Sequence, residues 1–337
     1  MRRTLKVLVV LVILVGAVAA LTYRWALERY GEQPLVFVNL PARVEVRPGM
    51  GLRQVGGALR AAGAQAPDWL FKLAARLRDD AHRLQVGIYE VREPQTLREL
   101  LDRMVAGDVL MAEIRFIEGW RFAQLRATVR AHPELRHETD SLDDRALLQR
   151  LGIERDHPEG LFFPSTYRFP AGSSDLDIYR MSHDALRKLL DEAWAGREEG
   201  LPLATPYEAL VLASVVEKET GVEADRPQIA GVFVNRLRRG MMLQSDPTTI
   251  YGLGDAFDGD LRRVHLRSDT PYNTYTRHGL PPTPIALVSR ASLRAVLHPA
   301  STDALYFVAR GDGSSQFSAT LGEHNSAVRR YQLGRPK

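Results

Sequence analysis

The sequence predicts an α+β protein with a single N-terminal transmembrane helix, a small βααβ module and a larger mixed α/β domain. Three observations predict this fold class: an uncharged run near the start, two helix signals between two strand-like segments, and later helices interspersed with short strands. The 337 residues, 45% hydrophobic and 26% charged, suffice for about two globular domains. We expect an N-terminus with its anchor, a stalk, a small module and a larger domain at residues 1–24, 25–35, 36–109 and 110–337.

The first part of the chain carries no charged side chain over residues 7–23. This run is just long enough to span a membrane, because a membrane helix needs about 20 apolar residues and at least about 17. The cations that precede the run favour a cytoplasmic N-terminus, so that the rest of the chain lies outside the cytoplasm. These cations are Arg2, Arg3 and Lys6. A cleaved signal peptide is the alternative, since residues 17–19 form an A-x-A site, but the apolar run continues to Leu21.

The small module begins with short strand signals within residues 36–46. A Pro-Gly turn follows, then helix signals near residues 52–62 and 68–78 and a strand at 87–91. Thr96 and Glu99 form a capping box, which predicts a helix that ends at Gly107. The strand–helix–helix–strand order resembles a LysM-like module, a fold that in many proteins binds glycan chains. A spacer without a binding role is the alternative.

The composition excludes several classes of chemistry. The chain has no cysteine, which excludes disulfides, thiol nucleophiles and cysteine-bound metals. The net charge of +4, from 45 basic and 41 acidic residues, is too small for a nucleic-acid footprint. The nine histidines form no His-Glu-x-x-His motif, and no Gly-x-Ser-x-Gly turn is present. We therefore expect no metal, no cofactor and no nucleic-acid partner.

A helix that begins at a Thr205–Glu208 capping box carries the main catalytic candidate. Its residues 209–216 are apolar on every face, which indicates a helix buried all round. Glu217 continues the same stripe, so we expect its carboxyl group to be buried, where desolvation favours the protonated form. Such an acid can donate a proton and later take one back. A structural glutamate neutralised by arginine is the alternative, and Glu219 is expected to be a solvated partner of a cation.

Polar and aromatic side chains after this helix are candidates for binding a sugar. Tyrosine rings and amide side chains in ordered loops suit sugar hydroxyl and acetamido groups, whereas loop packing is the alternative for each residue. A second helix is expected at residues 227–239, and strands near 305–309 and 316–318. The substrate-binding candidates are Gln244, Asp246, Tyr251, Asn273 and Tyr275, joined by Glu159 in a Gly- and Pro-rich loop.

The C-terminal half resembles the endolytic murein transglycosylase family, also called MltG or YceG-like. The resemblance rests on LASVVEKETG, VFVNRLRRGMMLQSDPTTIYGLG and PYNTYTRHGLPPTPI, followed by HPA and YFVA, in the family's order over about residues 205–330. It implies a membrane-anchored lytic transglycosylase that cuts nascent peptidoglycan strands internally, between N-acetylmuramic acid and N-acetylglucosamine. It also implies that Glu217 is the catalytic glutamate. The upstream loop PEGLFFPSTY keeps Glu159 but has Ser165 where the family usually has aspartate.

The resemblance implies that one glutamate acts twice, first as an acid on the glycosidic oxygen and then as a base on the sugar's C6 hydroxyl. The products would carry 1,6-anhydro ends, and the cut would limit strand elongation. The expected partners are peptidoglycan glycan strands and the inner membrane, with penicillin-binding protein synthases as further candidates. Two alternatives stay open: a hydrolytic muramidase that uses Asp246 or Glu159 as a second carboxylate, and a non-catalytic glycan-binding anchor that recruits cell-wall enzymes.

Overall fold

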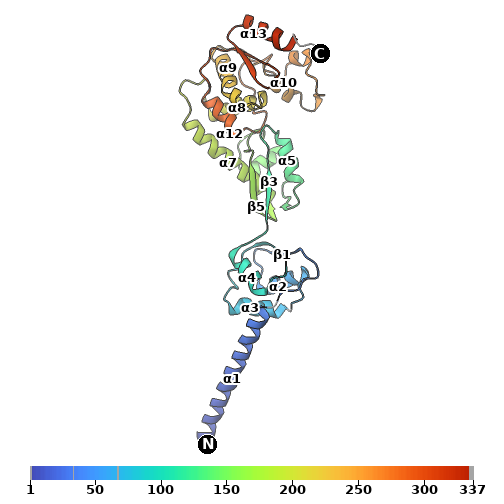
Figure 1. Cartoon of the computed structure of the whole chain (residues 1–337), viewed down its shortest axis with the longest axis vertical. Coiled ribbons are helices and arrows are strands. Elements are labelled where there is room, and N and C mark those ends of the chain that lie inside the picture. Colours follow the sequence, from blue (N-terminus) through green and yellow to red (C-terminus); the bar gives the residue numbers. More distant parts are fainter. Residues whose placement is uncertain (1, 33, 67, 334–337) are drawn as a thin grey trace. The chain divides into compact units, whose positions relative to one another are not determined.

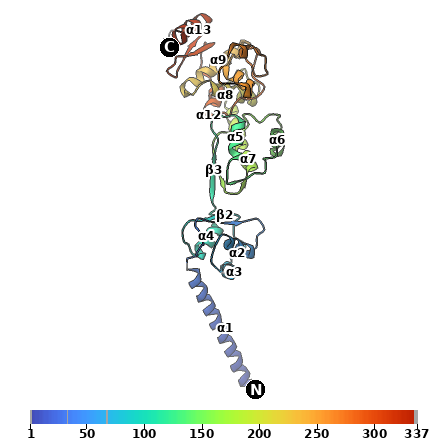
Figure 2. The same ribbon diagram turned by 90° about the vertical axis from the view of Figure 1, so that its right-hand side faces the viewer.

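The chain folds into two compact units (Figures 1 and 2). Unit 1 comprises Met1–Ala112 and Arg168–Ser173, and unit 2 comprises Glu113–Tyr167 and Ser174–Lys337. A computed structural model describes residues 2–32, 34–66 and 68–333, apart from the side chains of residues 2–8, 26–31, 68 and 77.

Unit 1 starts with the helix α1, Arg2–Gly31, which continues through much of the expected stalk. Its described apolar side chains are exposed, for example Leu11, Val15 and Leu21 at 58%, 63% and 68%. Among the helices whose side chains are described, none combines the length and apolar content needed to cross a membrane. The side chains of the three expected N-terminal cations lie outside the described residues.

A small sheet and three helices follow α1 in unit 1. The strands β1, Ala42–Val46, and β2, Gly87–Val91, pair antiparallel and place Val44 opposite Tyr89. Both side chains are fully buried in an apolar core. The helices are α2, Leu52–Ala61, α3, Asp68–Leu77, and α4, Leu97–Ala106. The expected strand–helix–helix–strand order and the Thr96 capping box with its left-handed Gly107 are confirmed.

The remaining elements combine helices with two-stranded sheets, in which β3 pairs with β5, β4 with β6, and β7 with β8. In chain order they are β3 Met111–Arg115, α5 Phe122–Arg130, β4 Leu135–Arg136, α6 Asp144–Leu151, β5 Thr166–Pro170, β6 Ser173–Ser174, α7 Asp175–Ala195, α8 Pro206–Glu219, η1 Glu223–Asp225, α9 Arg226–Arg238, α10 Asp246–Leu253, η2 Gly254–Ala256, α11 Arg263–Arg267, α12 Arg290–Leu297, β7 Tyr306–Ala309, β8 Ser315–Ser318, α13 Leu321–Val328 and η3 Arg329–Leu333. The expected C-terminal strands are thus confirmed as β7 and β8, and α13 packs beside this hairpin (Figure 2).

Helix α8 is the centre of unit 2. It contacts α7, α9, α10 and α12 (Figure 1), and all residues from Ala209 to Val216 are buried. Thr205 accepts a hydrogen bond from the Glu208 amide, as the capping box predicts. In the helix interior, the Ser214 hydroxyl accepts a 2.9 Å hydrogen bond from the Ile285 amide. The prediction of a fully buried helix is confirmed, and its end at Glu219 is therefore held in a fixed place.

The segment after α9 differs from its expected loop structure, because the helix α10 begins there. Asp246 is its first residue, and Pro247 lies in the first turn. Proline has no N–H group, but the N–H groups of a first turn have no partner within the helix, so no helical hydrogen bond is lost. The Ser-Asp-Pro sequence carried this helix signal. The turn-forming residues thus belong to the start of a helix and not to an extended loop.

The close approach of α9 to the segment after α12 yields a test of the packing around α8. A Cβ atom added at Gly231 would lie 2.7 Å from the Ala300 carbonyl oxygen and 2.8 Å from Thr302 Cγ2. We expect Gly231→Ala to lower the free energy of unfolding by about 1–3 kcal/mol, because a backbone atom must move to relieve the overlap. Urea-induced unfolding of the full chain measures this change.

Gly322→Ala is the matched control, since Gly322 is helical and a Cβ atom there meets nothing within 4 Å. This control should be neutral or slightly stabilising. Equal effects of the two substitutions would contradict the packing of α9 described above.

Candidate functional site

The last turn of α8 carries two glutamates, Glu217 and Glu219, that have different surroundings. Residues two positions apart on a helix are about 200° apart around its axis, so their side chains leave the helix in nearly opposite directions. Each glutamate is therefore described with its own partners.

Glu217 binds the start of α12. Its Oε2 atom accepts hydrogen bonds from the Ser289 amide at 3.0 Å and from the Ser289 hydroxyl at 2.5 Å. Its Oε1 atom lies 3.8 Å from Nη2 of Arg226, and the Glu217 side chain is only 5% exposed. The predicted burial is confirmed. Because Ser289 is the N-cap residue of α12, these bonds also join the end of α8 to the beginning of that helix.

A second acid lies close to this group. Burial raises the pKa of Glu118, and the negative charge of Glu217 raises it further, while Arg226 opposes this shift. Lys218 donates a 3.2 Å hydrogen bond to the carbonyl of Gly119, the residue after Glu118. Glu217 is thus surrounded by a second acid, one guanidinium group and a helix N-cap. These surroundings fit a structural glutamate neutralised by arginine as well as a catalytic acid.

Glu219 is half-buried and its carboxyl group is desolvated, so the expectation that it is a solvated partner of a cation is wrong. The Ser245 hydroxyl donates a 2.5 Å hydrogen bond to its Oε1 atom. Burial raises the pKa of Glu219 to about 7, and the nearby charge of Asp246 adds to the rise, whereas Ser245 and Arg236 oppose it. The segment that leads into α10 and the side chain of Arg236 cover this side of α8. Both lie outside α8, so the spacing of residues within the helix cannot predict that they cover Glu219.

A pocket of about 380 Å³ opens at Glu219. Its volume lies at the lower end of the range for ligand pockets, roughly 300–1,000 Å³. Three of the expected sugar-binding residues line it, together with residues that the sequence analysis did not select. The lining consists of Glu219, Arg236, Gln244, Asp246, Tyr275, Tyr306, Phe307, Leu321, His324 and Asn325.

Hydrogen bonds fix the polar side of this pocket. The Tyr275 hydroxyl donates to Asp246 Oδ1 at 2.6 Å. Gln244 has a φ of 48°, a left-handed conformation that is unusual for a residue other than glycine. Its backbone N–H group donates a hydrogen bond to the Thr274 carbonyl. Arg236 donates from Nε to the Leu305 carbonyl, at 2.7 Å, and from Nη1 to that of Leu243, at 2.6 Å. This arginine therefore joins α9 to both chain segments beside the pocket.

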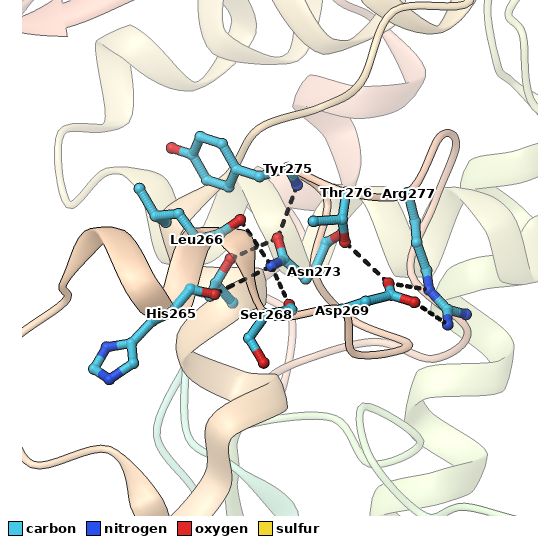
Figure 3. A network of polar contacts seen from close by, with 9 residues as sticks. His265, Leu266, Ser268, Asp269, Asn273, Tyr275, Thr276 and Arg277 are labelled. Carbon is cyan, nitrogen blue, oxygen red and sulfur yellow. Dashed lines mark hydrogen bonds and ion pairs between the residues drawn. The ribbon is translucent and has the colours of Figure 1, made fainter.

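Asn273 is fully buried and organises the loop that carries Tyr275 (Figure 3). Its amide nitrogen donates to three carbonyl groups, those of His265, Leu266 and Ser268, and its Oδ1 atom accepts from the Tyr275 amide. These bonds occupy the polar atoms of the Asn273 side chain. Direct contact of Asn273 with a substrate stays a prediction, and its visible task is to hold the loop.

Glu159 and Tyr251 lie together away from the lining of the Glu219 pocket. Glu159 is 3% exposed and accepts hydrogen bonds from the Phe122 amide, at 2.9 Å, and the Tyr251 hydroxyl, at 3.0 Å. Burial raises the pKa of Glu159 to about 7, although these two bonds oppose the rise. The Tyr251 ring packs on Tyr272 with centroids 4.8 Å apart. Their expected role in binding stays a prediction.

Among the residues that the structure describes, one group of side chains has the composition of a metal site. His137, Asp140 and Asp175 each offer a ligand atom, and these atoms lie within 4.8 Å of one another. Asp175 already accepts hydrogen bonds from the amides of Glu138 and Thr139 and from the Thr139 hydroxyl. Its carboxylate thus has a structural task at the start of α7.

Comparison with known proteins gives consistent results. The profile of the YceG-like family matches residues 44–330. An endolytic murein transglycosylase of Bacillus subtilis (strain 168) is 32% identical over 269 residues, which cover 74% of each protein. A protein of the same name from Streptococcus pneumoniae R6 is 26% identical over 331 residues, 85% of this chain and 57% of that protein.

A solved structure adds support at the level of the fold. The crystal structure of a yceG-like protein from Listeria monocytogenes, 28% identical, superposes with a TM-score of 0.53 over 84% of this chain and 97% of that one. Since the family profile spans most of the sequence and a relative above 30% identity covers three quarters of it, this chain belongs to the YceG-like family.

Proposed function

We propose that this protein is an endolytic peptidoglycan lytic transglycosylase, which cleaves the bond between N-acetylmuramic acid and N-acetylglucosamine within glycan strands. The names of the relatives and the family membership support this activity. The observation that carries the chemistry is Glu219, a buried carboxyl group with a pKa of about 7 that opens onto a polar and aromatic pocket. An acid with this pKa exchanges a proton readily near neutral pH.

We assign the proton transfer to Glu219. In the first step its carboxyl group protonates the glycosidic oxygen as the bond to the anomeric carbon breaks, and the 2-acetamido group of the substrate stabilises the positive charge. In the second step the Glu219 carboxylate removes the proton from the C6 hydroxyl, whose oxygen bonds to the anomeric carbon. The product carries a 1,6-anhydro ring, no water is consumed, and the proton is again on Glu219.

The surroundings of Glu219 suit both steps. Ser245 and Arg236 stabilise the carboxylate that exists between the steps, while burial and Asp246 favour the protonated form that begins each cycle. Glu217, the candidate from the sequence resemblance, has its Oε2 atom bonded twice to Ser289 and does not line the pocket. Its assignment as the catalytic acid stays a prediction that a direct comparison can decide.

Two features support a place at the membrane. The uncharged run at residues 7–23 and the exposed apolar side chains of α1 support a single-pass anchor in the inner membrane, with the chain after residue 24 outside the cytoplasm. The small sheet and helices of unit 1 support a LysM-like module that contacts the glycan. Partnership with peptidoglycan synthases is a further proposal, since an enzyme that cuts nascent strands has to act where they are made.

The substitutions Glu219→Gln and Glu217→Gln test the assignment. We expect Glu219→Gln to lower the rate of strand cleavage at least about 100-fold, because glutamine cannot transfer the proton. Glu217→Gln keeps a carbonyl oxygen that can accept from Ser289, so we expect it to retain more activity than Glu219→Gln. Mass spectrometry of digested peptidoglycan strands measures both the cleavage and the new chain ends.

The same experiment separates the competing functions. Reducing ends in place of anhydro ends would identify a hydrolytic muramidase, for which Asp246 beside Glu219 is the available second carboxylate. If only Glu217→Gln loses cleavage, Glu217 and not Glu219 is the residue that transfers the proton. Unchanged cleavage in both variants would contradict every assignment of the acid to this turn.

The raised pKa of Glu219 also predicts a pH-dependent stability. Between the ordinary value of 4.5 and about 7, the unfolded chain ionises Glu219 while the folded chain keeps it protonated, so the folded state loses stability as the pH rises. Glu219→Gln has no ionisable group at this position, so its folded state does not lose this stability as the pH rises. We therefore expect the variant to gain up to about 3 kcal/mol relative to wild type between about pH 4.5 and pH 8.

Urea-induced unfolding of both chains across this pH range measures the difference. Glu199→Gln, at an exposed glutamate, is the control and should show a difference that does not change with pH. A constant difference between Glu219→Gln and wild type would contradict the buried, protonated state of Glu219.

A further inference from the structure

The pocket at Glu219 has a wall that comes from the last elements of the chain. Tyr306 and Phe307 lie on β7, and Leu321, His324 and Asn325 lie on α13. These residues follow Glu219 by about a hundred positions, and none of them is explained by the proton transfer. The packing of α13 on the β7–β8 hairpin brings them to the pocket.

His324 is held in a defined orientation within this wall. Its ring stacks on Tyr306, with the centroids 5.2 Å apart and the planes 25° from parallel. The Arg236 guanidinium lies 5.3 Å from the centroid of the same Tyr306 ring. A histidine that is packed in this way presents its ring edge with little conformational freedom, which reduces the entropy lost when a ligand binds.

The two ring nitrogens of His324 have different surroundings. Nδ1 is buried and has no hydrogen-bond partner among the described residues. Burial, and next the charge of Arg236, lower the pKa of His324, so the ring is neutral near neutral pH. A neutral imidazole can donate at one nitrogen and accept at the other. Nε2 is therefore the atom of His324 that can bond to a molecule in the pocket.

We propose that His324 is a substrate-binding residue whose Nε2 atom hydrogen-bonds the sugar that lies beside Glu219. The inference rests on the proposed function and extends it to the C-terminal wall. Asn325 and Gln244 line the same pocket and carry amide groups, which pair with an acetamido group through one donor and one acceptor. The sugar held at this position is accordingly an N-acetylated amino sugar.

Three substitutions of His324 test which nitrogen matters. Glutamine places an amide near the position of Nε2, asparagine places one near Nδ1, and alanine places none. We expect His324→Ala and His324→Asn to weaken binding of peptide-free glycan strands about 3- to 10-fold, the effect of one lost hydrogen bond. His324→Gln should retain most of the affinity. In the cleavage assay the same loss should appear in KM more than in kcat.

Binding is measured with the full chain carrying Glu219→Gln, so that strands are not cut during titration, and KM and kcat are measured without that substitution. His298→Asn, at an exposed histidine of unit 2 that does not line the pocket, is the control. Unchanged affinity in His324→Ala would overturn the proposal, as would equal losses in His324→Gln and His324→Asn, which indicate a packing role for the ring. Residual cleavage by Glu219→Gln would overturn the assigned acid, and binding would then be measured in chains that carry both Glu217→Gln and Glu219→Gln.

Discussion

The burial of α8 on all sides is the constraint on which the candidate site depends. A helix that packs against α7, α9, α10 and α12 cannot rotate or slide without disturbing four interfaces. The position of its last turn is therefore fixed. Two carboxyl groups leave that turn in different directions, and one of them enters a pocket while the other binds the N-cap of α12. The same helix thus places one carboxyl group at a pocket and links α8 to α12 through the other.

The pocket is polar near Glu219 and aromatic at other parts of its lining, a combination that suits carbohydrate. Tyr275, Tyr306 and Phe307 offer apolar ring surfaces, and Asp246 and Arg236 offer charged groups. The positive charge of Arg236 also limits the rise in the pKa of Glu219. Both the protonated and the ionised form of this carboxyl group are therefore populated near neutral pH. Burial alone would hold the proton too firmly for its transfer to a substrate oxygen.

Much of the fold could be predicted from local signals, because capping boxes and apolar periodicity act within one element. The Thr96 and Thr205 caps and the burial of residues 209–216 are examples. The surroundings of Glu219 could not be predicted in this way. Its cover comes from Ser245 and Arg236, which are distant in sequence and meet it only through tertiary packing. The helix α10 was missed for a different reason, since Ser-Asp-Pro is both a turn signal and a helix start.

The arrangement of the pocket has a consequence for how distant substitutions would act. Its lining joins α8 to β7 and α13, which lie about a hundred residues further along the sequence. A change that loosens α13 from the β7–β8 hairpin would leave α8 and its glutamates in place but would open the wall of the cavity. Such a change would impair the site without altering either carboxyl group.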